Sequence, residues 1–125
     1  MAHFAKLDDN NIVIDMLVVY DHDTADENGI EKEEIGQKFL SESIGGKWVQ
    51  YSYNNRIRKQ CPAIGYRYDE DGDVFVAPKP FKQWILNSNY DWEAPISEPE
   101  PIEGYHWHWN EQEEGFWESH PNDPM

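Results

Sequence analysis

The stretch WHWNEQEEGFW, residues 107–117, has the layout of a β-hairpin and decides the expected fold. Aromatic residues alternate with histidine at its start, a polar turn rich in glutamate follows, and Phe116 and Trp117 close it. Successive side chains of a strand point to opposite faces, so Trp107 and Trp109 are expected to share one face. The stretch therefore predicts two short antiparallel strands joined by an acidic turn.

The same eleven-residue layout occurs earlier in the chain, in YRYDEDGDVFV at residues 66–76. Tyr66 and Tyr68 alternate with an arginine, an acidic turn holds Gly72, and two valines return on one face. Glycine and aspartate favour tight turns. The repeated layout predicts a second hairpin built like the first.

A shorter hairpin is predicted between these two, in WILNSNYDW at residues 84–92. A three-residue loop at residues 87–89 places Leu86 opposite Tyr90 and the two terminal tryptophans opposite each other. All four large side chains then share one side of the ribbon. Cross-strand aromatic pairs of this kind help to hold a two-stranded ribbon together, since such ribbons are marginal in water.

The N-terminal half predicts one more hairpin, at residues 2–20, and one helix. Apolar residues at helical spacing over residues 30–44 indicate a short amphipathic helix that ends at Gly45 and Gly46. Strands are also expected at residues 47–55 and 56–61. The predicted fold is mainly β (α+β): antiparallel hairpins in a meander, one short amphipathic helix and an aromatic C-terminal hairpin.

Prolines and charge suggest a division of the chain into four parts. We expect a β-rich body at residues 1–94 and an acidic, proline-rich linker at residues 95–104, because proline cannot continue a central strand. The C-terminal aromatic hairpin is expected at residues 105–119, and a frayed tail at residues 120–125.

The composition excludes several classes of function. The 125-residue chain has 25 acidic and 10 basic residues, a net charge of -15, which disfavours nucleic acid and anionic membranes as partners. A single cysteine, Cys61, rules out an intrachain disulfide. We find no catalytic constellation and no phosphate-binding glycine loop, so the sequence predicts neither an enzyme nor a cofactor.

Two metal-site patterns are considered and rejected. The acidic run at residues 69–73 lacks the glycine and the later glutamate that a calcium-binding EF-hand loop needs. His106 and His108 lie two apart in a predicted strand and point the same way, but the sequence fixes no third ligand for a transition metal. We therefore predict no metal site.

Binding or assembly remains, and two kinds of partner are open. Tryptophan and tyrosine anchor protein interfaces because they bring large area at little entropic cost, which favours a protein-contact surface formed by Trp107, Trp109, Phe116 and Trp117. Exposed indoles also stack on sugar rings, which favours a carbohydrate platform formed by Trp84, Trp92, Trp107 and Trp109.

Several segments in the same order resemble a small protein family of tailed phages of marine bacteria, including cyanophages. They are MAHFAKLD at the start, GGKWVQYSYN at 45–54, IGYRYD at 64–69, FVAPKPF at 75–81, WEAP at 92–95 and the C-terminal YHWHWNEQEEGFWE. The resemblance spans nearly the whole chain and implies a structural virion protein, of the head or the tail, that is synthesised in the host cytoplasm. Its implied partners are capsid or tail subunits and further copies of the chain. An acidic inhibitor of a host factor is a further alternative.

Overall fold

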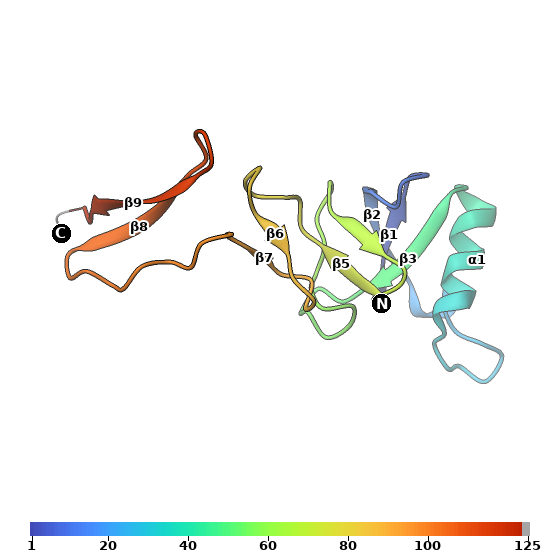
Figure 1. Cartoon of the computed structure of the whole chain (residues 1–125). Coiled ribbons are helices and arrows are strands. Elements are labelled where there is room, and N and C mark those ends of the chain that lie inside the picture. The colour runs from blue at the N-terminus through green and yellow to red at the C-terminus, as the bar shows by residue number, and fades with distance from the viewer. Residues whose placement is uncertain (124–125) are drawn as a thin grey trace. The chain divides into compact units, whose positions relative to one another are not determined.

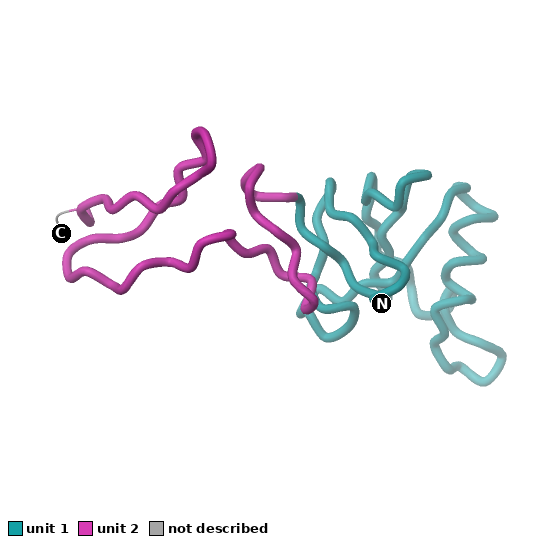
Figure 2. Tube along the Cα trace, viewed as in Figure 1, with its two compact units in different colours: residues 1–78 teal, residues 79–125 magenta. Residues whose placement is uncertain are grey.

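The structure, a computed structural model that describes residues 1–123, is mainly antiparallel β with one short helix, as predicted. It divides into two compact units, Met1–Pro78 and Lys79–Met125 (Figure 2). The division falls at residue 78 and not at the proline-rich segment. Residues 79–94, which the sequence assigned to the body, group with the C-terminal hairpin in unit 2. The reason is local packing: Trp84 contacts Trp109 and Trp117 of the C-terminal hairpin.

Unit 1 is built on a three-stranded sheet with the order β2-β1-β3 (Figure 1). Its strands are β1 (Ala2–Leu7), β2 (Val13–Val19) and β3 (Lys47–Tyr51). The first two form the predicted N-terminal hairpin. Asp8 fixes its turn, because its carboxylate accepts hydrogen bonds from the backbone N–H groups of Asn10 and Ile12.

Helix α1 (Glu33–Ser43) lies beside β3 and covers one face of this sheet (Figure 1). A short 3₁₀ turn, η1 (Asp21–Asp23), precedes it. The helix falls within the predicted range 30–44 and stops where Gly45 adopts a φ of 90°. Leu40 of the helix is buried in a cluster with side chains of all three strands, namely Ala2, Phe4, Val19 and Trp48.

The hairpin of β4 (Arg67–Asp69) and β5 (Val74–Val76) contributes to the core on the other face of the sheet. Phe75 is fully buried there and lies opposite Tyr68 in the hairpin register. Cys61 is half-buried and packs against the same cluster. The sheet of unit 1 therefore has a hydrophobic core on each side.

The predicted strand at residues 56–61 does not form. Arg58 and Lys59 adopt positive φ values of 52° and 76°, and β3 pairs with β1 instead of with this segment. Turn signals at Asn54 and Asn55 suggested a hairpin, but β1 offers β3 a partner that local sequence does not reveal. The segment is an irregular loop that positions Arg58.

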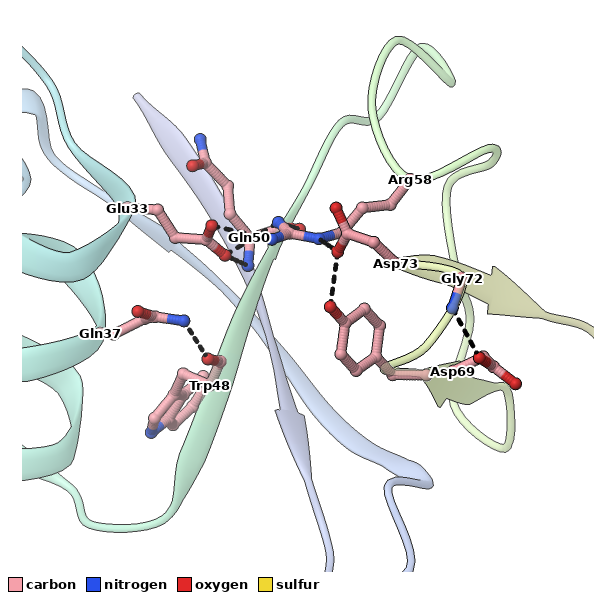
Figure 3. A network of polar contacts seen from close by, with 9 residues as sticks. Glu33, Gln37, Trp48, Gln50, Arg58, Asp69, Gly72 and Asp73 are labelled. Carbon is pink, nitrogen blue, oxygen red and sulfur yellow. Dashed lines mark hydrogen bonds and ion pairs between the residues drawn. The ribbon is translucent and has the colours of Figure 1, made fainter.

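Arg58 is the centre of a polar network in unit 1 (Figure 3). It donates to both carboxylate oxygens of Glu33, to the carbonyl oxygen of Gln50 and to Asp73. Burial opposes its charge, but the hydrogen bonds to Glu33 and Asp73 outweigh burial and raise the pKa of the guanidinium. The network joins the helix, β3 and the turn of the β4–β5 hairpin.

Unit 2 contains two separate two-stranded ribbons. The first pairs β6 (Ile85–Leu86) with β7 (Trp92–Glu93), and the second pairs β8 (Tyr105–Asn110) with β9 (Phe116–Pro121). The predicted C-terminal hairpin is therefore present, but its second strand continues through Pro121. The prediction that a frayed tail begins at residue 120 is therefore wrong for His120 and Pro121, which belong to β9. Residues 124–125 of the predicted tail lie outside the described residues.

The register of the first ribbon differs from the prediction. Leu86 lies opposite Trp92 and not opposite Tyr90, which shifts Trp84 out of register with Trp92. The side chain of Asn87 causes this shift, because it accepts hydrogen bonds from the backbone N–H groups of Asn89 and Asp91 and widens the loop.

Candidate functional site

Four aromatic side chains pack together in unit 2, and we call them the indole cluster: Phe81, Trp84, Trp109 and Trp117. The ring centroids of Trp109 and Trp117, which are cross-strand partners, lie 5.2 Å apart at an interplanar angle of 80°. Trp84 lies 6.2 Å and 6.1 Å from these two rings, and Phe81 lies 5.1 Å from Trp84. Edge-to-face contacts at these distances stabilise aromatic cores. The cluster joins the first ribbon to the second.

Trp109 is the centre of the cluster and is only 2% exposed. Its indole N–H donates to the side-chain oxygen of Gln83 over 3.2 Å. The amide nitrogen of Gln83 in turn donates to the backbone carbonyl oxygens of Glu111 and Glu113 in the β8–β9 turn. Gly115 allows this turn to close over the ring, since its φ is 85° and a Cβ there would lie 2.3 Å from a Trp109 ring carbon.

The proline-rich segment at residues 95–104 is not a free linker. The indole N–H of Trp117 donates to the backbone carbonyl oxygen of Ile96 over 2.8 Å. The indole N–H of Trp107 donates to the backbone carbonyl oxygen of Glu100 over 3.2 Å. An extended segment with free carbonyl oxygens suits such donors, because a polyproline-like backbone makes no internal hydrogen bonds. The indoles of the C-terminal ribbon thus hold their own chain's acidic segment.

A hollow of about 540 Å³ opens beside the indole cluster. Trp84, Trp92 and Trp117 line it together with residues that include Glu93 and Glu98. The indole nitrogen of Trp84 is buried and has no hydrogen-bond partner among residues 1–123. A buried donor without a partner is costly, so this nitrogen marks a place where the packing of unit 2 leaves a polar group unsatisfied.

The structure brings the predicted contact residues together only in part. Trp107, Trp109 and Trp117 lie on one face of the β8–β9 ribbon, as expected from the alternation of strand side chains. Phe116 lies on the opposite face, opposite Asn110, because it directly precedes Trp117 in the strand. Burial makes Trp109 a core residue of unit 2 and removes it from any contact surface.

The predicted carbohydrate platform is likewise divided by the structure. Trp84 and Trp92 both line the hollow. Trp107 does not line it, and the ring of Trp109 is covered by the turn that contains Gly115. Trp117, which the sequence did not assign to a sugar site, takes their place.

The other face of the β8–β9 ribbon carries a group that we call the histidine face, formed by His106, His108, Glu118 and His120. The hairpin register places His106 opposite His120 and His108 opposite Glu118. Asn110 donates to the carboxylate of Glu118 over 2.9 Å, which, with the nearby histidines, lowers the pKa of that carboxyl. The sequence paired His106 with His108 but did not place His120 beside them, because the frayed tail was expected to begin at His120.

Comparison with known proteins adds no relative: no protein-family model, no curated protein and no solved structure matches the chain. The resemblance to the phage family therefore stays a prediction.

Proposed function

We propose that the protein is a non-enzymatic structural component that acts through protein–protein contacts, with unit 2 as the contact-making part. One observation carries this proposal. Within residues 79–123, Trp109 is the one buried hydrophobic side chain, whereas unit 1 buries twelve. A segment of this length normally needs more burial than this to offset the entropy of ordering it.

Exposed apolar side chains show where further burial can be gained. Tyr105 and Phe116 are 48% and 46% exposed and lie on opposite faces of the β8–β9 ribbon. Ile96 and Ile102, at the two ends of the proline-rich segment, are 56% and 46% exposed. Aromatic and aliphatic groups of this kind form the centre of protein interfaces when a partner covers them.

The resemblance to the phage family supports a more specific proposal, a protein of the virion with capsid or tail subunits as partners. The charge of -15 agrees with a protein partner and not with nucleic acid or an anionic bilayer. In the part of the chain that the structure describes, no helix has the length and apolar character needed to cross a bilayer. Further copies of the chain are partners of the same class.

Mass spectrometry of purified particles from a tailed phage that encodes this chain tests the proposal. We expect the protein in stoichiometric amounts, and a lower amount in particles that carry Phe116→Ala. The matched control is Ile64→Ala, because Ile64 is also exposed but belongs to unit 1. Absence of the protein from intact particles contradicts the virion role.

The hollow beside the indole cluster favours a second candidate function, recognition of a host surface glycan. Its indole faces suit the apolar faces of sugar rings, and Glu93 and Glu98 supply acceptors for hydroxyl groups. Binding of the full chain to a glycan array tests this candidate. We expect Trp92→Ala to abolish binding and Trp107→Ala to leave it unchanged, since Trp107 lies outside the hollow. No binding, or equal loss in both variants, contradicts it.

A further inference from the structure

The histidine face has the register of a three-histidine metal site. His106 and His108 lie two apart on β8, and His120 lies directly opposite His106 on β9. Side chains at such positions project from the same face of an antiparallel ribbon. Two histidines on one strand and a third on its neighbour can therefore present three imidazole nitrogens to one ion.

The ring spacing agrees with this geometry. The centroid of the His120 ring lies 5.7 Å from that of His106 and 5.6 Å from that of His108. Imidazoles that bind one tetrahedral zinc ion at about 2.0–2.1 Å have ring centroids roughly 5 Å apart. The spacing of His120 from each of the other two rings thus suits a shared ion, but the His106 and His120 rings are stacked at an interplanar angle of 23° and have to turn before their nitrogens converge.

Glu118 lies beside His120, where its carboxylate could join the same ion. Its carboxylate oxygen Oε1 lies 3.1 Å from Nε2 of His120. Two neighbouring ligand atoms of a tetrahedral zinc ion lie roughly 3.3 Å apart. This contact lacks the geometry of a hydrogen bond, so Nε2 of His120 is a buried nitrogen without a hydrogen-bond partner among the described residues.

The side chain of Asn122 sets the tautomer of the His106 ring. Nδ1 of His106 lies 3.0 Å from the side-chain oxygen of Asn122, which can only accept a hydrogen bond. The proton of a neutral His106 ring is therefore placed on Nδ1, and the lone pair on Nε2 is left to bind a metal ion. Metal-binding histidines typically make such a second hydrogen bond, which sets the tautomer and the ring orientation.

We propose that this face of the β8–β9 ribbon binds one divalent transition-metal ion of the zinc class, through the side chains of His106, His108, Glu118 and His120. Imidazole nitrogens select zinc, copper or nickel over calcium and magnesium, which prefer oxygen ligands. The net charge of -15 raises the local concentration of any cation. The proposal does not depend on the proposed function of the protein.

Binding requires the rings to rotate. In the arrangement described for residues 1–123, no three His, Cys, Asp or Glu side chains converge as metal ligands. His106 and His108 are exposed, and the ring contacts of both are with His120, so no buried packing opposes their rotation. We therefore expect weaker binding than at a preformed structural zinc site, and binding that ties β8 to β9.

Zinc titration of the full chain, after removal of metal with a chelator, tests the proposal. A chromophoric chelator that competes for Zn²⁺ reports affinity, and NMR of the histidine ring nitrogens reports the ligands. We expect one zinc equivalent, shifts confined to the three rings, and slower amide exchange in β8 and β9. His120→Gln is expected to weaken binding at least about tenfold, and Glu118→Gln to weaken it by less.

His22→Gln is the matched control. His22 lies 3.2 Å from a carboxylate oxygen of Asp23, so it tests for non-specific binding to a surface pair of histidine and carboxylate. Far-UV circular dichroism and tryptophan emission verify that each variant is folded. Absence of zinc binding overturns the proposal, and so does an affinity that is unchanged in folded His120→Gln or equally reduced in His22→Gln.

Discussion

Arg58 and Glu33, which are 25 residues apart in the sequence, form an ion pair with two parallel hydrogen bonds of 2.8 Å and 2.9 Å. The Arg58 side chain is 16% exposed and the Glu33 side chain 26%. Such two-pronged pairs between guanidinium and carboxylate are stronger and more specific in geometry than single contacts. This pair fixes the start of helix α1 to a loop that has no regular secondary structure.

Removal of Arg58 is expected to destabilise unit 1. In Arg58→Gln, Glu33 keeps a mostly buried charge without its cation, which costs about 2–3 kcal/mol of the free energy of unfolding. Urea unfolding followed by circular dichroism measures this cost. The control is Arg56→Gln, since Arg56 is exposed on the same loop; equal destabilisation by both variants would contradict the role of the ion pair.

Asp73 is expected to make the stability of unit 1 depend on pH. Hydrogen bonds from the Tyr68 hydroxyl and from Arg58 lower the pKa of Asp73 below its ordinary value of 3.8. Because the folded pKa is the lower one, ionised Asp73 stabilises the fold above about pH 4, and this contribution is lost as pH falls through the folded pKa. Wild type is therefore expected to be more stable than Asp73→Asn at pH 6, and the difference to shrink below pH 3.8.

The control for this pH series is Asp71→Asn, which removes the same charge from an exposed neighbour in the turn. It separates the specific contacts of Asp73 from relief of the overall negative charge. A stability difference between wild type and Asp73→Asn that persists unchanged into acid would show that the carboxylate form of Asp73 is not what stabilises the fold.

Local pattern predicted much of this fold, because hairpins and helices are encoded by alternation, spacing and turn residues over about a dozen positions. The N-terminal hairpin, the helix ending at Gly45 and the ribbon around Trp109 were predicted in this way. Pairings between distant segments were not, since no local signal shows that β3 joins β1 or that Arg58 reaches Glu33. These contacts are set by tertiary packing.

The candidate sites show the same limit. Alternation alone placed the indoles of the C-terminal ribbon on one face, but it could not show that the turn containing Gly115 buries Trp109. The position of His120 opposite His106 was not predicted, for a different reason. A hairpin register centred on the pair of Trp109 and Trp117 extends to His106 and His120, but the strand was expected to stop at residue 119, two residues before its observed end at Pro121.

Gly36 is expected to be required in helix α1, although alanine is the better helix former. A Cβ at Gly36 would lie 2.4 Å from Cζ of the buried Phe4 ring. Overpacking of a core costs about 1–3 kcal/mol, which exceeds the gain of about 1 kcal/mol in helix propensity. Thermal unfolding should show a lower midpoint for Gly36→Ala, with Ser43→Ala at the exposed helix end as the control. A raised midpoint would mean that Phe4 moves aside freely.

Gly115 and Gly104 provide a matched pair that isolates the packing of Trp109. Both have positive φ values, 85° and 82°, so alanine strains the backbone at either position by about 1–2 kcal/mol. Only at Gly115 would the new Cβ also meet the ring of Trp109, whereas the space around Gly104 is open. We therefore expect Gly115→Ala to destabilise unit 2 more than Gly104→Ala, by about 1–3 kcal/mol, and to expose the Trp109 ring to water. Amide exchange of β8 and β9 together with the wavelength of tryptophan emission measures both effects. Equal behaviour of the two variants would show that the turn does not close over Trp109 in solution, and that the indole cluster lacks the buried centre on which unit 2 depends.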